Sequence, residues 1–141
     1  MRVILYNSGL GPKIPTRQKT STIRGFTVSK KTGRKGGGAK CKPGDELSHR
    51  VWTGKPYRSK QQEIHRSICK RIRKVQMYWD NNDVAIRIDG EYITHAVALQ
   101  LLADQEGFEN IGELKDYFKK SAKLNIGWHP KPFEGEMIEW E

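Results

Sequence analysis

The sequence predicts an α+β fold, built as a small β-barrel with two helices inserted before the last strand. Short runs rich in β-branched and aromatic residues recur along the chain, bounded by glycine, proline, asparagine or aspartate. Two segments with a helical spacing of apolar residues come late, over 94–106 and 110–118. We expect a barrel because closing the sheet is the simplest way to cover the edges of many short strands.

The strands expected in the N-terminal half lie at 3–6, 20–24, 46–52 and 62–78. In the third, alternate residues are expected to point to opposite faces. In the last, isoleucines recur every four residues from Ile64, a spacing that fits a helix face as well as a strand. Val75 and the methionine two residues later favour the strand, one position out of register, which predicts a β-bulge.

The C-terminal half begins with turns and then becomes helical. Residues 80–83 and the Asp-Gly pair at 89–90 predict turns on either side of a return strand over 84–88. The sequence favours Thr94 and Asn110 as N-caps of the two helices, and Gly107 as the C-cap of the first, because these residue types satisfy free backbone groups at helix ends. The last strand is expected over 136–140.

One domain over residues 1–141 is expected, with a flexible basic loop at about 29–40. Three successive glycines give this loop a large backbone entropy, so we expect it not to order by itself. Such a loop can close over a phosphate. It lacks the strand and helix that frame a P-loop, however, which excludes a nucleoside triphosphate site of that kind.

Charge is divided unevenly along the chain, whose net charge is +10. Residues 1–74 contain 20 lysines and arginines and three acids, whereas residues 75–141 contain six and 13. Such a distribution attracts a polyanion to one part of the surface, and nucleic acid is the obvious candidate. A solvated basic face, or one that pairs with the acidic half, is the alternative.

Composition also limits the class of protein. No run of about 18 apolar residues occurs, and the first apolar stretch is too short for a signal peptide, so we expect a cytoplasmic protein without membrane contact. Cys41 and Cys69 form no CxxC pair and are expected to be reduced. The four histidines have no metal-binding spacing, and we expect neither a metal nor another cofactor.

The most informative segment is Lys-Thr-Ser-Thr-Ile-Arg at 19–24, which holds an amine, three hydroxyls and a guanidinium within six residues. A lysine near a hydroxyl can activate it for nucleophilic attack when burial lowers the pKa of the amine. The same groups could hold a phosphate. A polar strand start with threonine at a β-favoured position is the plainest interpretation.

Four motifs together resemble the ASCH domain family, a branch of the PUA-like β-barrels. They are K-T-x-T-I-R at 19–24, K-P-G-D-x-L at 42–47, W-T-G-K-P-Y-R-S-K-Q at 52–61, and A-D-Q-E-G-F at 103–108 with F-E-G-E-M-I-E-W at 133–140. Their order spans nearly the whole chain. The third is similar to short phage-encoded or prophage-encoded members, which implies the cytoplasm of a bacterial cell.

The resemblance implies a PUA-like barrel with a cleft beside residues 19–24 and an association with RNA. One bacterial branch of the family hydrolyses the exocyclic amide of N4-acetylcytidine with a lysine, a threonine and a glutamate. Carried over by motif, these are Lys19, Thr22 and Glu106. A buried ion pair between the lysine and the glutamate, with a purely structural role, is the alternative.

Binding of RNA or DNA, or of a modified nucleoside, without catalysis is the first hypothesis. Cations would hold phosphates, and two aromatic side chains would stack on bases. Trp52 is equally expected as a core residue. The candidate nucleic-acid-binding residues are Arg17, Arg24, Lys30, Lys31, Arg34, Lys35, Trp52, Lys55, Tyr57, Arg58 and Lys60.

Two enzymatic hypotheses stand beside it. In an amidohydrolase, Thr22 would attack the acyl carbonyl, a neutral Lys19 would take the proton and Glu106 would donate to the departing amine. In a metal-independent ribonuclease, His49 and His65 are the candidate base and acid, although histidines are more often structural or surface residues.

Overall fold

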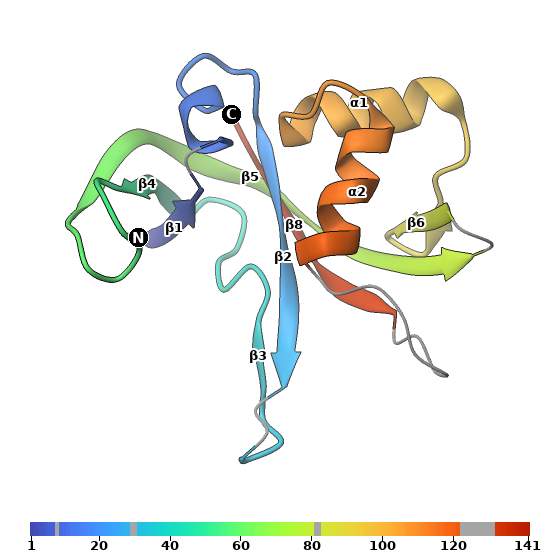
Figure 1. The fold of residues 1–141 in the computed structure, drawn as a ribbon, viewed down its shortest axis with the longest axis horizontal. Coiled ribbons are helices and arrows are strands. Elements are labelled where there is room, and N and C mark those ends of the chain that lie inside the picture. Colours follow the sequence, from blue (N-terminus) through green and yellow to red (C-terminus); the bar gives the residue numbers. More distant parts are fainter. Residues whose placement is uncertain (8, 29–30, 81–82, 122–131) are drawn as a thin grey trace.

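The computed structural model describes residues 1–7, 9–28, 31–80, 83–121 and 132–141. One extended sheet runs through this part of the chain, and two helices pack beside it (Figure 1). The elements, in chain order, are β1 (Arg2–Tyr6), the 3-10 turn η1 (Gly11–Lys13), β2 (Ser21–Val28), β3 (Lys35–Gly37), β4 (Glu46–Trp52), β5 (Gln61–Asp80), β6 (Asp83–Ile88), β7 (Glu91–Tyr92), α1 (Ala96–Glu106), α2 (Ile111–Ser121) and β8 (Phe133–Trp140).

The sheet confirms the predicted α+β class. Its strands follow the order β1-β4-β5-β8-β2-β3, with β6 on β5 and β7 on β6. Only the β1–β4 pair is parallel among the described pairings. Within the described residues this order is an open path with β1 and β3 at its ends, and no pairing joins those two strands.

The 20-residue strand β5 connects the two halves of the sheet and contains an irregularity, as the sequence predicts. Its register against β8 shifts between Cys69 and Arg71, slightly earlier than the spacing of apolar residues indicates. A second shift, between His49 and Arg50 of β4, was not predicted. The predicted alternation of β4 is nevertheless kept: Leu47 and His49 lie toward Trp140, whereas Arg50 Nε donates to the Ser48 hydroxyl on the other face.

Two hydrophobic clusters lie on the two faces of the central strands. One contains Ile23, Met137 and apolar residues of β5 and β6, and α1 and α2 pack on it. The other contains Ile138, Trp140 and residues of β1 and β4. Neighbouring residues of β8 thus belong to different clusters, because successive side chains of a strand point to opposite faces.

The helix ends agree with the sequence in two of three cases. Gly107 ends α1 in the left-handed conformation at φ 86°, and Asn110 Oδ1 accepts a hydrogen bond from the Glu113 amide at the start of α2. The N-cap of α1 is His95 rather than Thr94, because the ring of His95 accepts from the amide of Val97 at 3.3 Å.

Part of the expected loop at 29–40 forms strand β3, which pairs with β2. The glycines permit this close approach. A Cβ at Gly37, whose φ is 74°, would lie 2.3 Å from the main-chain oxygen of Gly25, which also accepts a bond from the Gly38 amide. The triple glycine therefore supports a tight strand pair here.

Candidate functional site

The segment before β2 covers the C-terminal end of α1. Lys19 Nζ donates to the main-chain oxygen of Glu106 at 2.9 Å, and Lys13 Nζ donates to that of Gly107 at 2.5 Å. The amide of Thr20 donates to the oxygen of Gln105 at 2.8 Å. The last carbonyls of a helix have no partners within it and carry its negative partial charge, so two cations are well placed here.

Gly107 allows this contact for two reasons. Its φ of 86° is a conformation that side chains rarely adopt, and a Cβ there would lie 3.2 Å from Cβ of Lys19. Glycine therefore both ends α1 and leaves room for the lysine. The motif that carries Glu106 and Gly107 and the motif that carries Lys19 meet at this point.

The carboxylate of Glu106 lies within a buried polar cluster with Lys19 and Ser21. The Ser21 hydroxyl donates to Glu106 Oε2, and Lys19 Nζ lies 4.0 Å from Oε1. The residues are 0–2 % exposed. Burial lowers the pKa of Lys19; the Glu106 charge opposes this, and nearby Arg24 and Lys13 add to it. The amine is therefore more easily deprotonated than that of an exposed lysine.

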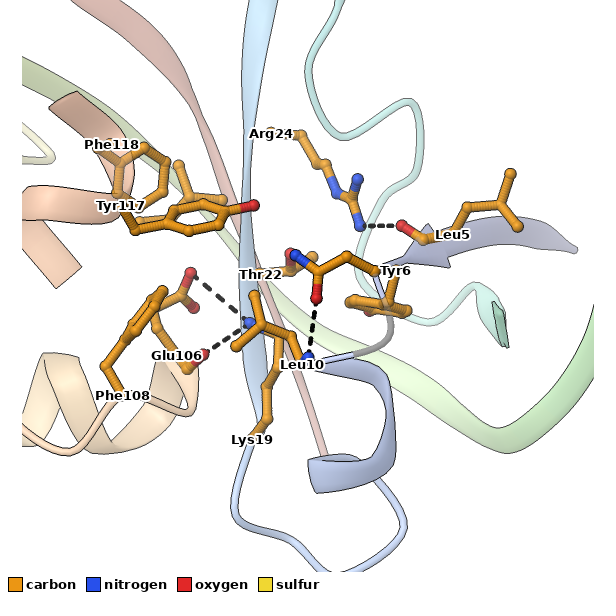
Figure 2. A pocket seen from close by; sticks show the side chains of 12 residues that line it. Leu5, Tyr6, Leu10, Lys19, Thr22, Arg24, Glu106, Phe108, Tyr117 and Phe118 are labelled. Atoms are coloured by element: carbon orange, nitrogen blue, oxygen red, sulfur yellow. Dashed lines mark hydrogen bonds and ion pairs between the residues drawn. The ribbon is translucent and has the colours of Figure 1, made fainter. Parts of the chain in front are cut away.

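This cluster opens onto a cavity of about 130 Å³ between β2 and the helices. Figure 2 shows Lys19 and Glu106 on one side of it, with Thr22 and Arg24 of β2 nearby. Thr22 is 5 % exposed. The three residues that the family resemblance indicates thus line one cavity. Its aromatic walls are Tyr6, Phe108, Tyr117 and Phe118.

Arg24 lies at the edge of the cavity with hydrogen-bonding capacity to spare. One terminal nitrogen donates to the Leu5 main-chain oxygen at 2.7 Å, and the guanidinium carbon lies 5.1 Å from the ring centre of Tyr6. Its Nε is buried and has no partner among the described residues. A buried donor without a partner is costly, so this atom can bond an acceptor from a ligand or a water molecule; the Nε atoms of Arg2 and Arg87, outside the cavity, also have no partner among the described residues.

The hydroxyl of Tyr6 belongs to a second polar cluster and also has a hydrogen bond with Arg24 of the cavity. It bonds His49 Nδ1 at 2.9 Å, and His49 Nε2 bonds the Ser67 hydroxyl at 2.7 Å. Burial lowers the pKa of His49 to about 4, and the charges of His65, Lys19 and other cations add to this effect. His49 is 0 % exposed and packs 4.4 Å from the Trp140 ring, which leaves it no access to a phosphate.

Most of the other candidate cations in the described part of the chain lie on two hairpins that project from different sides of the molecule (Figure 1). Lys31, Arg34 and Lys35 are exposed at the β2–β3 hairpin. Arg17 is exposed before β2, in a left-handed conformation with φ 62°. Lys30 lies outside the described residues.

The β4–β5 hairpin carries the remaining candidates. Lys55, Arg58 and Lys60 are exposed there. Trp52 is half-buried and outside both core clusters, and its ring centre lies 5.3 Å from that of Tyr57, which is 87 % exposed. This hairpin does not line the cavity.

Several residues of the site have no distinctive signal in the sequence. Ser21 was noted only as one of three hydroxyls in its segment, and its partner in α1 lies 85 positions away. Tyr6 and Tyr117 gave no signal beyond their apolar character, because their place in the wall depends on how β1 and α2 pack against β2.

In comparisons with protein-family models, curated proteins and solved structures, nothing matches this chain. Neither helix in the described part of the chain is long and apolar enough to cross a membrane. The described residues also contain no group of three histidine, cysteine, aspartate or glutamate side chains that could hold a metal ion.

Proposed function

We propose that the protein binds a single pyrimidine-type base, modified or not, in the cavity beside Lys19, Thr22 and Glu106. The carrying observation is a cavity of about 130 Å³ that combines aromatic walls with converging polar groups. A protein cavity of about 150 Å³ accommodates benzene, so this space suits one six-membered ring. A purine, with two fused rings, fits it less well.

The lining groups suit the edge and the faces of such a base. Lys19, Thr22 and Arg24 offer donors to ring carbonyl oxygens and nitrogens, whereas the Glu106 carboxylate accepts from an exocyclic amine. Phe108 and Tyr117, whose ring centres lie 5.3 Å apart, provide apolar wall surface. Proteins that take a base out of a strand bind it by this combination of edge hydrogen bonds and aromatic contact.

The proposal includes membership of the ASCH family and a PUA-like barrel. It is supported by the order of the four motifs, together with the position of the cavity beside the K-T-x-T-I-R segment. Burial of Met137 and Ile138 on opposite faces of β8 is consistent with a sheet that wraps around its core. An experimental structure in which β1 and β3 diverge, with no wrapping of the sheet, would contradict the barrel.

A second candidate function is hydrolysis of an N4-acylcytidine amide, favoured by the convergence of Lys19, Thr22 and Glu106. Thr22 Oγ1 would bond to the acyl carbon while neutral Lys19 takes the hydroxyl proton. The C–N bond would then break, and the proton would pass to the departing cytidine amine. Water would hydrolyse the threonyl ester and regenerate Thr22. The lowered pKa of Lys19 supports its part as the base.

The experiment is a titration of the protein with free nucleosides, followed by calorimetry for affinity and mass spectrometry for products. Cytidine, uridine, N4-acetylcytidine and adenosine form the panel. We expect pyrimidines to bind more tightly than adenosine, and the Thr22→Val variant to lose about 3- to 10-fold in affinity with one hydrogen bond. Thr20→Val is the matched control, since that side chain lies outside the cavity.

The outcomes separate the two functions. Binding without release of cytidine supports a reader of bases, and release that disappears in Thr22→Val supports the hydrolase. Equal affinity for all four nucleosides, or no binding by any of them, contradicts the proposed function.

A further inference from the structure

A second, wider cavity continues from the base-sized one along β2. It has a volume of about 400 Å³ and shares Ile23, Arg24, Tyr117 and Phe118 with the first cavity. It is more open, and its outer residues are Gly25, Phe26, Thr27 and Phe133. The two cavities therefore adjoin each other at Arg24, Tyr117 and Phe118.

Aromatic rings follow this path in a continuous series. The ring centres of Phe108 and Tyr117 are 5.3 Å apart, those of Tyr117 and Phe118 5.2 Å, and those of Phe118 and Phe133 5.5 Å. Phe26 lines the outer end of the groove. Because these rings pack against one another at tilted angles, only the parts of the series that border the groove, such as Phe133, offer stacking surface to a base.

Gly25 of β2 leaves room for the ring of Phe133 at the outer part of the groove. A Cβ at Gly25 would lie 2.7 Å from the ring of Phe133, so the ring lies directly on the glycine backbone. A side chain there would displace Phe133. Next to Arg24 along β2, the groove is therefore lined by the ring of Phe133 and not by a side chain at position 25.

Charge along the groove matches a nucleic-acid backbone. Arg24 lies where the two cavities meet, and its buried Nε lacks a partner among the described residues. At the outer end, Lys35 Nζ lies 4.2 Å from the ring centre of Phe26. Arginine suits a phosphate because its donors match two oxygens at once.

We propose that the groove binds the nucleotide next to the base in the cavity, so that the ligand is single-stranded nucleic acid rather than a free nucleoside. Arg24 holds the phosphate between the two nucleotides, and Phe26 and Phe133 receive the neighbouring base. This inference rests on the proposed function, because it takes the first base to be in the cavity.

The test compares free cytidine with single strands of two and four nucleotides containing cytidine, for the wild type and two variants. Phe26→Ala removes an aromatic ring from the groove alone. Tyr92→Ala is the matched control: Tyr92 lies on β7 outside both cavities, is 56 % exposed, and has Arg87 at 5.6 Å from its ring centre. Affinities of the tighter ligands are measured by calorimetry, and those of ligands too weak for calorimetry by NMR titration.

We expect the dinucleotide to bind at least about 10-fold more tightly than cytidine. Phe26→Ala should weaken dinucleotide binding by about 5- to 150-fold, the range for loss of one base stack, and leave cytidine binding unchanged. Tyr92→Ala should change neither. A dinucleotide that binds no better than cytidine, or is insensitive to Phe26→Ala, overturns this inference while leaving the proposed function intact. If nothing binds, both proposals fail.

Discussion

Two buried polar clusters differ in what their polar atoms face. The pocket cluster, Lys19, Ser21 and Glu106, adjoins a cavity. The histidine cluster, Tyr6, His49 and Ser67, is packed, and both ring nitrogens of the histidine have partners. Both clusters consist of buried polar groups. What marks the pocket cluster as a candidate site, and the histidine cluster as a structural network, is only the cavity beside the first.

The largest expected effect comes from the pocket cluster. Lys19→Met keeps the length of the side chain but leaves the Glu106 carboxylate and carbonyl without their cation. Breaking a buried charged pair from one side costs about 3–5 kcal/mol, so we expect the free energy of unfolding to fall by about this amount. Chemical denaturation measures it. The double variant with Glu106→Gln should recover part of the loss, and an unchanged stability of Lys19→Met would contradict the described pairing.

The histidine cluster should dominate the acid sensitivity of the fold. The pKa of His49 is lowered to about 4, against an ordinary value of 6.5, so the unfolded chain binds this proton more readily than the folded one. Its contribution is complete above pH 6.5, declines as the pH falls and is lost near pH 4. The difference amounts to at most about 3 kcal/mol.

Unfolding free energies measured between pH 8 and pH 4 check this expectation. In a His49→Gln variant, the part of the decline due to this histidine should disappear. Parallel curves for the variant and the wild type would show that His49 titrates normally.

A smaller effect is expected at Tyr6, which belongs to the histidine cluster and whose ring also lines the cavity. Tyr6→Phe removes the hydroxyl that faces His49 but keeps the ring that lines the cavity. We expect a loss of about 1–2 kcal/mol in the free energy of unfolding, because the histidine loses one partner. Cytidine affinity, measured by calorimetry, should stay within about 2-fold. A large loss of affinity would mean that the clusters are coupled.

The smallest effect belongs to a surface cation. Arg66 pairs with Glu63 at 2.7 Å, and its side chain is 61 % exposed. Arg66→Ala should leave the free energy of unfolding almost unchanged, since water screens such pairs. Denaturation of this variant beside Lys19→Met compares removal of a cation from the surface with removal from the pocket cluster. Equal losses of unfolding free energy in Arg66→Ala and Lys19→Met would contradict the claim that the buried cation contributes more than the exposed one.

Local signals predicted most elements but only part of the site. Gly107 and Asn110 marked helix ends because their residue types suit particular backbone positions. Pairing of residues far apart in the chain leaves no such mark. Lys19 and Glu106 were connected only through the family resemblance, and the contact of Ser21 with Glu106 follows from the packing of α1 against β2.

Errors in the predicted elements have similar causes. The register shift between β4 and β5 at His49 and Arg50 has no mark in the sequence, because it depends on how the two strands pair. Thr94 and His95 can both accept a hydrogen bond from a free amide at the start of α1. In the structure the His95 ring accepts it, from the amide of Val97. The three glycines predict backbone freedom in the loop, which stays a prediction; they also allow the close approach of β3 to β2.

The most direct test of the central claim is an NMR titration of the protein labelled with ¹⁵N with free cytidine, following backbone amide shifts. The account predicts that the perturbed amides cluster around Thr22, Arg24, Glu106 and Tyr117, the residues of the cavity. The amides of residues 53–60, in the β4–β5 hairpin, should remain unchanged. Shifts confined to that hairpin, or no shifts at any cytidine concentration, would contradict a base-binding site in the cavity.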